Sequence, residues 1–139
     1  MKVHLTRRYL IAASHRLHSD KLSAADNRDT YGKCNNPYGH GHNYAVEVTV
    51  SGQVNPQTGM VCNLADLDEC FRREVVERFD HQNLNTRPEF AEQVPTTENF
   101  AVVIYDILKR EFNVAHLEKV RIDETANNSF EYCGIAQLS

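Results

Sequence analysis

The sequence lacks the features that mark several large classes of protein. No apolar run approaches the roughly 20 residues of a membrane span. Residues 1–8 interrupt their apolar side chains with charge too often to form the apolar segment of a signal peptide. These absences predict a protein of the cytoplasm that has no membrane partner.

Paired cysteines and nucleotide-binding fingerprints are missing as well. The four cysteines include no CxxC pair and do not form the dense framework of a small secreted domain, so we expect reduced thiols. There is no Gly-rich dinucleotide fingerprint. Since internal repeats, domain linkers and low-complexity tracts are absent too, we expect residues 1–139 to form a single domain.

Charge is unevenly distributed along the chain. The net charge is −4 at pH 7, yet residues 1–33 carry seven lysines and arginines against three aspartates. The overall acidity argues against nucleic acid as a partner. The basic stretch could receive a small anionic substrate, although a solvated surface is the simpler alternative.

Two segments of alternating apolar and polar residues predict strands. One covers residues 3–15, and the other, over residues 40–50, has the clearest alternation in the sequence. Between them, the polar stretch 19–39 predicts a long loop, and loops of that length in compact domains are commonly functional. A turn over residues 54–59 leads into a short predicted strand around residues 60–62.

Apolar residues at spacings of three and four then predict two amphipathic helices. Asn63 is positioned to cap the first, and Thr96 or Thr97 the second. Residues 117–124 and 129–133 are typical of a closing hairpin. The order of strands, two helices and strands predicts an α+β fold, a four-stranded antiparallel sheet with two helices on one face. The exposed edges of such a sheet favour assembly into an oligomer.

Three histidines are predicted to converge where the first two strands meet. If those strands pair antiparallel, His40 and His42 project from the same face as His15. Three neutral imidazoles with an open fourth position form the ligand set of a catalytic zinc site. The alternative is a chance His-x-His pair and an unrelated core histidine.

A cysteine lies close to these histidines in the sequence. Cys34 stands six residues before His40. A thiol beside a dication is deprotonated more easily and can act as a general base. A small buried residue is the alternative, but the neighbours Lys33, Asn35 and Asn36 disfavour apolar surroundings.

Two further positions carry carboxylates that could take part in catalysis or ligand binding. Asp80 next to His81 can orient the imidazole and raise its basicity, although adjacent side chains often point apart. Glu124 shares the parity of Val120 and Ile122, so its carboxylate faces the core and needs a partner. A ligand with two adjacent N–H donors would satisfy it. The alternative is a strand end that frays into solvent.

Taken together, these motifs resemble the 6-pyruvoyl-tetrahydropterin synthase family, in its biopterin-type branch. The resemblance follows the family's order over nearly the whole chain. It implies the tunnelling fold, a ββααββ unit whose sheets join around a trimeric barrel, with two trimers forming a homohexamer and active sites between subunits. The motifs are Cys34-Asn-Asn-Pro-Tyr-Gly-His-Gly-His-Asn-Tyr44, Thr58-Gly-Met60, Asp80-His-Gln-Asn-Leu84, Pro95-Thr-Thr-Glu-Asn99 and Glu124-Thr-Ala-Asn-Asn128.

The resemblance also implies a role for each candidate residue. Three histidines would hold Zn²⁺, a cysteine would accept a proton, an Asp-His pair would relay protons, and a glutamate would anchor the pterin ring. In that scheme the metal ligands are His15, His40 and His42, the catalytic residues are Cys34, Asp80, His81 and Glu124, and the substrate-binding residues are Thr96, Thr97, Glu98 and Glu124.

The implied reaction is a lyase reaction on a pterin triphosphate. It converts 7,8-dihydroneopterin triphosphate into 6-pyruvoyl-tetrahydropterin and triphosphate, with Zn²⁺ as cofactor and Mg²⁺ associated with the substrate's phosphates. The closest alternative is 6-carboxy-tetrahydropterin synthase of the queuosine pathway, but five residues separate Cys34 from His40, as in the biopterin-type branch.

Two further alternatives fit the motifs less well. A variant that cleaves the same substrate for folate carries glutamate at or near the cysteine position, so Cys34 argues against it. A non-catalytic module with structural zinc would be expected to supply a fourth protein ligand.

Overall fold

The two long predicted strands form an antiparallel ribbon. A computed structural model describes residues 1–135 of the chain. In it, β1 (Lys2–His15) and β2 (His40–Gln53) pair over their whole length. The ribbon begins with Lys2 opposite Gln53 and ends with His15 opposite His40. Because the pairing is antiparallel, the last residue of one strand meets the first of the next.

Three more strands complete a mixed sheet of order β3-β1-β2-β4-β5. β4 (His116–Thr125) and β5 (Asn128–Tyr132) form the predicted hairpin and extend the sheet antiparallel from β2. β3 (Gln82–Asn83) pairs parallel with β1. The predicted four-stranded antiparallel sheet is therefore wrong in number and in kind, because a two-residue strand has no periodicity for the sequence to reveal.

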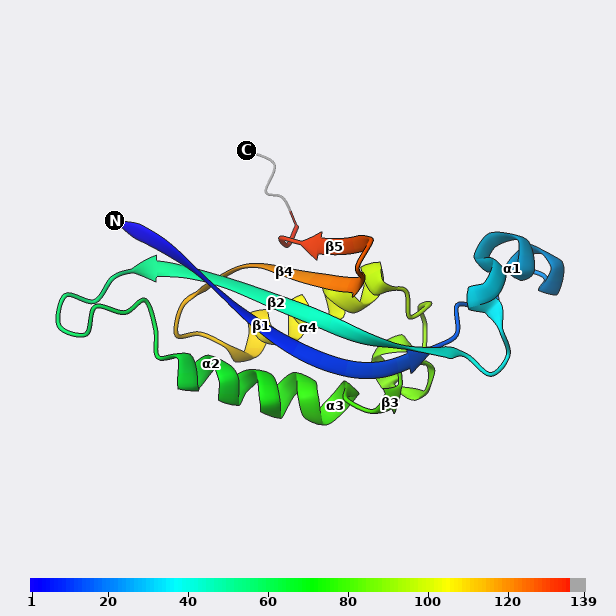
Figure 1. Cartoon of the computed structure of the whole chain (residues 1–139), viewed down its shortest axis with the longest axis horizontal. Coiled ribbons are helices and arrows are strands. Elements are labelled where there is room, and N and C mark those ends of the chain that lie inside the picture. The colour runs from blue at the N-terminus through cyan, green and yellow to red at the C-terminus, as the bar shows by residue number, and fades with distance from the viewer. Residues whose placement is uncertain (136–139) are drawn as a thin grey trace.

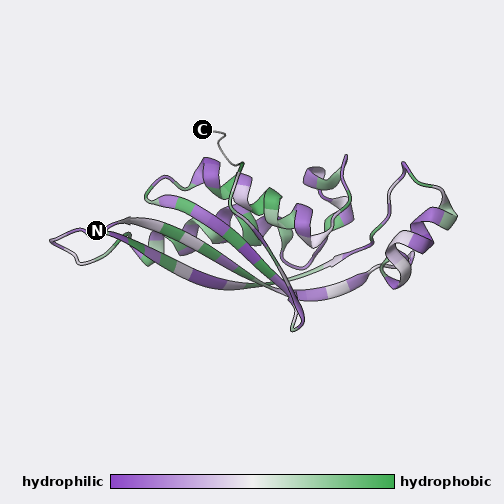
Figure 2. Cartoon of the chain, turned by 90° about the horizontal axis from the view of Figure 1, so that it is seen from above, coloured by the Kyte–Doolittle hydropathy of each residue, from purple (hydrophilic) through white to green (hydrophobic). Residues whose placement is uncertain are grey.

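Two helical segments cover one face of the sheet (Figure 2). Asn63 caps the first by accepting a hydrogen bond from the Ala65 N–H, and Thr96 caps the second by accepting one from the Asn99 N–H, as predicted. The first segment consists of α2 (Leu64–Phe71), a π-helical turn (Arg72–Val76) and α3 (Glu77–Phe79), and the second is α4 (Thr97–Glu111).

The core lies between these helices and the sheet. Alternate residues of β2, among them Val46, Val48 and Val50, are fully buried. Phe71 and Phe100 bury their rings against that face from the helices. Each such side chain contributes about 1.5–3 kcal/mol through removal from water. His40 and His42 belong to the same alternation as these valines, so the packing also determines the face of the sheet on which the histidines lie.

The predicted long loop over residues 19–39 is wrong. It contains α1 (Ala24–Tyr31) and a 3₁₀ turn (Gly32–Asn35), which lie beyond the end of the β1–β2 ribbon (Figure 1). Ser23 caps α1, and the fully buried Asn27 amide donates to the main-chain oxygens of Ser19, Leu22 and Ser23. Polar contacts rather than an apolar stripe hold this helix, so no hydrophobic periodicity announces it.

The predicted strand around residues 60–62 is also wrong. These residues close a turn in which the Asn55 N–H donates to the Met60 carbonyl, and no strand within residues 1–135 pairs with them. None of the helices in residues 1–135 has the length and apolar character needed to cross a membrane.

Candidate active site

Three imidazoles meet at the end of the β1–β2 ribbon. His15 closes β1, and His40 and His42 open β2 on the same face. The ring centroids lie 4.6–5.1 Å apart, and one ring nitrogen from each residue falls within 4.8 Å of the other two. The closest pair is His15 Nε2 and His40 Nε2, at 2.9 Å. Strand pairing thus brings together side chains that lie 25 residues apart in the chain.

Contacts behind His15 fix its tautomer. Its Nδ1 lies 2.7 Å from the carbonyl oxygen of Pro95, and the Tyr44 hydroxyl lies 3.3 Å from the same nitrogen. A carbonyl oxygen can only accept, so Nδ1 carries the proton and Nε2 presents its lone pair. A ring orientation set by a main-chain carbonyl in this way is typical of metal-binding histidines.

The environment of the cluster favours neutral imidazoles. Burial lowers the pKa of His15, with smaller lowering contributions from the neighbouring histidines. Burial also lowers the pKa of His40, followed by the charge of His42. Since a metal binds the neutral ring, both shifts favour ligation.

The donor set fits a zinc ion. His42 Nε2 is buried and has no hydrogen-bond partner among the described residues. Glu124 Oε1 lies 4.0 Å from it. An unsatisfied buried polar atom costs about 1–3 kcal/mol, which coordination to a cation would remove. Three convergent imidazole nitrogens, with no fourth ligand among residues 1–135, match an open Zn²⁺ site.

Cys34 lies beside this cluster, in the 3₁₀ turn. Its carbonyl accepts a hydrogen bond of 2.8 Å from the Leu17 N–H, which ties the turn to the chain just after His15. The thiol is partly exposed. Burial raises the pKa of the Tyr44 hydroxyl, the charge of Glu124 adds to the increase, and Cys34 contributes less in the same direction. The main-chain contact with Leu17 therefore holds Cys34 next to the strand end that carries His15.

Glu124 faces the cluster from the end of β4. The Thr97 hydroxyl donates a short hydrogen bond to Glu124 Oε2, and the Asn128 amide lies 3.5 Å from Oε1. Thr97 is buried at the start of α4, and Thr96 caps that helix. By contrast, Glu98 is exposed, and its side chain makes no hydrogen bond or ion pair within residues 1–135. Two of the three predicted pocket residues at this helix start are thus built into the local structure.

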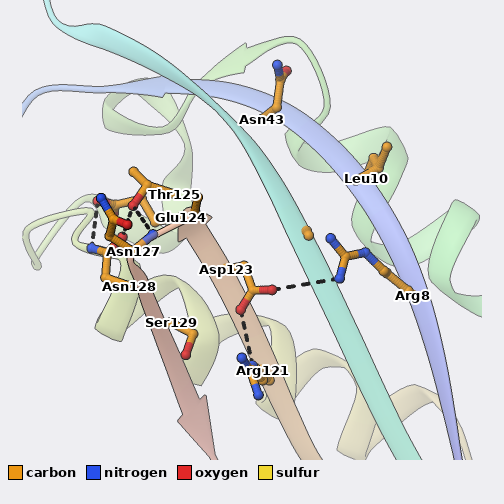
Figure 3. A pocket seen from close by; sticks show the side chains of 12 residues that line it. Arg8, Leu10, Asn43, Arg121, Asp123, Glu124, Thr125, Asn127, Asn128 and Ser129 are labelled. Carbon is orange, nitrogen blue, oxygen red and sulfur yellow. Dashed lines mark hydrogen bonds and ion pairs between the residues drawn. The ribbon is translucent and has the colours of Figure 1, made fainter.

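Glu124 also borders a hollow of about 510 Å³ on the open face of the sheet. Figure 3 shows Thr125, Asn127 and Asn128 around the β4–β5 turn, next to Glu124. Farther along, Asp123 lies 3.7 Å from Arg8. The carboxylate that contacts the α4 start is therefore also accessible from a polar surface.

Asp80 and His81 lie on the other side of β1. Asp80 Oδ1 accepts a hydrogen bond of 2.9 Å from the Ala12 N–H, and the His81 N–H donates to the Ala12 carbonyl. His81 Nε2 is 3.5 Å from Asp80 Oδ2, so these adjacent side chains do approach each other. His81 is well exposed, and it lines a hollow of about 540 Å³ together with His42. His81 therefore borders a space that is also open to one member of the histidine cluster, His42.

Two contributors to the site were not predicted from the sequence. Tyr44 continues the parity of His40 and His42, which could have indicated its position next to the cluster. The carbonyl of Pro95 gave no signal of its own, because a main-chain acceptor can occur at any residue.

Comparison with known proteins identifies the family. Residues 4–134 match the family described as 6-pyruvoyl tetrahydropterin synthase. The chain belongs to this family. The 6-pyruvoyl tetrahydrobiopterin synthase of Homo sapiens is 50% identical over 131 residues, which cover 94% of this chain and 90% of the relative. The enzyme of the same name from Poecilia reticulata is 48% identical over 132 residues, with the same coverage.

A solved structure supports the same family. The 6-pyruvoyl tetrahydropterin synthase of Caenorhabditis elegans superposes with a TM-score of 0.92 at 44% identity, and 97% of each chain is covered. The resemblance inferred from the motifs is therefore confirmed, and the α+β fold with its mixed sheet is that of the 6-pyruvoyl tetrahydropterin synthase family.

Proposed function

We propose that this protein is a zinc-dependent 6-pyruvoyl-tetrahydropterin synthase. It converts 7,8-dihydroneopterin triphosphate into 6-pyruvoyl-tetrahydropterin and inorganic triphosphate. The observation that carries the proposal is the unsatisfied Nε2 of His42, which points into a cluster with His15 and His40 in a chain that belongs to this family. A Zn²⁺ ion bound there supplies Lewis-acid chemistry that acidifies the substrate's hydroxylated side chain.

The chain itself positions the pterin. Glu124 accepts hydrogen bonds from the two adjacent N–H groups of the aminopyrimidine edge. The Thr97 hydroxyl holds one carboxylate oxygen of Glu124 in place, so the carboxylate is orientated before the substrate arrives. Thr96 supports the arrangement by capping α4, and Glu98 lines the same substrate pocket as Thr96 and Thr97.

Proton transfer falls to Cys34 and to the Asp80–His81 pair. Cys34 approaches from the 3₁₀ turn and accepts a proton from the substrate side chain. Asp80 is anchored to the Ala12 N–H and keeps His81 at 3.5 Å, so the imidazole can pass protons in the hollow that it shares with His42. Triphosphate leaves by elimination, and Mg²⁺ accompanies the phosphates.

The same proposal extends to assembly and location. We place the enzyme in the cytoplasm as a homohexamer, a dimer of trimers with active sites between subunits. Leu10, 72% exposed on the open face of the sheet, and the free edge of β5 are surfaces that such an assembly would cover.

The second candidate is 6-carboxy-tetrahydropterin synthase, which acts on the same substrate. The spacing of Cys34 and His40 favours the biopterin-type reaction. A non-catalytic zinc module is disfavoured because the three histidines leave a position open.

Mass spectrometry of the product distinguishes these functions. Purified zinc-loaded protein is incubated with 7,8-dihydroneopterin triphosphate and Mg²⁺, and both pterin and small products are identified. We expect 6-pyruvoyl-tetrahydropterin with one equivalent of triphosphate. Acetaldehyde with a carboxylated pterin would assign the second candidate, and unchanged substrate would overturn the enzymatic proposal.

A further inference from the structure

A basic hollow lies next to the turn that carries Cys34. It has a volume of about 310 Å³ and is bounded by the chain after β1, by α1 and by the 3₁₀ turn. Three of its lining residues are cationic, Arg16, Arg28 and Lys33, and none is a carboxylate. Volumes of this order are at the lower end of those found for small-ligand sites.

In the part of the chain that the structure describes, the cations around this hollow have no carboxylate partners. Elsewhere in the described chain most arginines pair with acids, as Arg7 does with Asp68 at 3.0 Å. Arg16 makes one side-chain hydrogen bond, from Nε to the carbonyl of Asn35 at 3.1 Å, so its two terminal nitrogens remain available within residues 1–135. Arg28 and Lys33 make no side-chain hydrogen bond or ion pair there, although α1 also carries Asp26 and Asp29. Unpaired positive charges that share a concave surface attract anions.

One neutral donor, on His18, adds to the same surface. The Asn35 amide donates to the Leu17 carbonyl and to His18 Nδ1, at 2.8 and 3.1 Å. Neutral His18 therefore carries its proton on Nε2, whose nearest acidic atom is Asp20 Oδ1 at 3.6 Å. The Asp20 carboxylate is fully exposed and lies outside the lining of the hollow.

Residues that line the hollow are chain neighbours of residues in both parts of the candidate active site. Arg16 follows His15 directly, and Lys33 and Asn35 flank Cys34. The Leu17–Cys34 main-chain hydrogen bond joins the two segments. An anion held here would therefore contact the chain segments that carry His15 and Cys34.

We propose that this hollow binds the triphosphate group, both as the tail of the substrate and as the released product. The identity of the substrate rests on the proposed function, whereas the evidence for anion binding is the set of cations that line the hollow. Guanidinium groups match phosphate oxygens with two parallel hydrogen bonds, and an ammonium adds a point charge. A polyanion suits the site better than a monophosphate because three cations line it.

The test uses inorganic triphosphate as the probe. Its binding to the zinc-loaded full chain is measured by isothermal titration calorimetry for wild type, Arg28→Gln and Lys33→Gln. Each matched control removes the same charge from α4, Arg110→Gln for the arginine and Lys109→Gln for the lysine. We expect each hollow variant to weaken binding about tenfold or more, since hydrogen bonds to charged groups are strong, and each control to bind as wild type does.

Steady-state kinetics separate this inference from the proposed function. With 7,8-dihydroneopterin triphosphate, the hollow variants should raise KM and weaken product inhibition by triphosphate by the same factor. If wild type binds triphosphate through these residues but turns over no pterin, the proposed function fails and the anion site stands. If wild type turns over the pterin while Arg28→Gln and Lys33→Gln leave KM and triphosphate binding unchanged, the anion site is wrong and the function stands.

Discussion

The Nδ1 atom of His15 lies 2.7 Å from the carbonyl oxygen of Pro95, 80 residues further along the chain. The contact joins the last residue of β1 to the segment just before the cap of α4. It makes the orientation of one imidazole depend on how the helix packs against the sheet. The fold therefore does more than bring three histidines together, since it also selects which nitrogen of His15 faces the other two.

Removal of one imidazole from this cluster should abolish zinc binding. His40→Ala deletes the nitrogen that faces His15 Nε2 at 2.9 Å. Loss of an outer contact to a metal ligand typically costs 10–100-fold in affinity, so loss of the ligand itself should cost at least about 100-fold. Zinc content is measured by atomic absorption after dialysis.

His116→Ala is the control, because His116 is an exposed histidine at the far end of the same sheet. Its zinc content should equal that of wild type. Equal zinc in His40→Ala and wild type would show that the cluster does not bind the ion.

Cys34→Ala should separate catalysis from metal binding. The thiol lies outside the histidine cluster, so the variant should keep its zinc and its melting temperature. Its kcat should fall by about 10²–10⁴, the usual contribution of a general base. Cys133→Ala removes an exposed thiol from beyond β5 and should retain full turnover. Loss of zinc in Cys34→Ala would favour a structural role for the metal site.

Glu124→Gln should weaken substrate binding. The change replaces one acceptor oxygen by a donor amide and removes the charge that faces the aminopyrimidine N–H groups. We expect kcat/KM to fall about 10–100-fold, because hydrogen bonds to a charged group contribute roughly 1.5–3 kcal/mol. Glu131→Gln, on the exposed surface of β5, provides the control. A wild-type kcat/KM for Glu124→Gln would place the pterin elsewhere.

How far the sequence predicts this molecule depends on the kind of signal. Strand alternation placed His15, His40 and His42 on one face because a period of two leaves no freedom in the side a residue takes. The same reasoning missed α1, since buried Asn27 holds it through main-chain contacts and no apolar stripe exists. It also missed the Pro95 contact, which depends on tertiary packing between β1 and the start of α4.

Arg7 is another residue whose role the sequence pattern does not reveal. It interrupts the apolar parity of β1, which reads as an exception in the sequence. In the fold, its guanidinium makes two hydrogen bonds of 3.0 Å to Asp68 on α2. Tyr9 donates to the same carboxylate at 2.7 Å and stacks on Phe71 with ring centroids 3.9 Å apart. The residue that breaks the apolar pattern thus forms a polar contact between β1 and α2.

The contact of Asp68 with Arg7 and Tyr9 predicts that the free energy of unfolding depends on pH. The hydrogen bonds from Arg7, and then that from Tyr9, lower the pKa of Asp68. Because the folded pKa lies below the unfolded value of about 3.9, the stabilisation is complete above that pH and is lost as the pH falls through the folded pKa. The site is partly exposed, so we expect about 1 kcal/mol at neutral pH, or about 3–5 °C in Tm.

Thermal unfolding of Asp68→Asn and wild type measures this effect. The difference in Tm should be largest from pH 5 to 7 and should shrink below about pH 4. Asp106→Asn, an exposed aspartate on α4, should show no such dependence. A constant difference across the range would mean that the charge of Asp68 does not matter.

Gly39 links backbone geometry to the histidine cluster. It has φ +72°, and a Cβ at this position would lie 3.0 Å from the His15 carbonyl oxygen. Gly59 has nearly the same φ, +73°, with nothing within 4 Å of an added Cβ. An alanine at either position costs about 1 kcal/mol or more, because a left-handed backbone strains a side chain. Only at Gly39 must the strand end that carries His15 also move.

Gly39→Ala should therefore lower zinc affinity as well as stability, whereas Gly59→Ala should lower stability alone. We expect the Gly39 variant to lose about tenfold in zinc affinity, comparable to the loss of an outer contact of a metal ligand. Competition with a chelator measures the affinity, and thermal unfolding of the metal-free proteins measures the strain that the two variants share. Unchanged zinc affinity in Gly39→Ala, with a stability loss equal to that of Gly59→Ala, would show that the cluster tolerates a displaced β1 end. In that case three histidines on paired strands would suffice for the site without a fixed approach of the two chain segments.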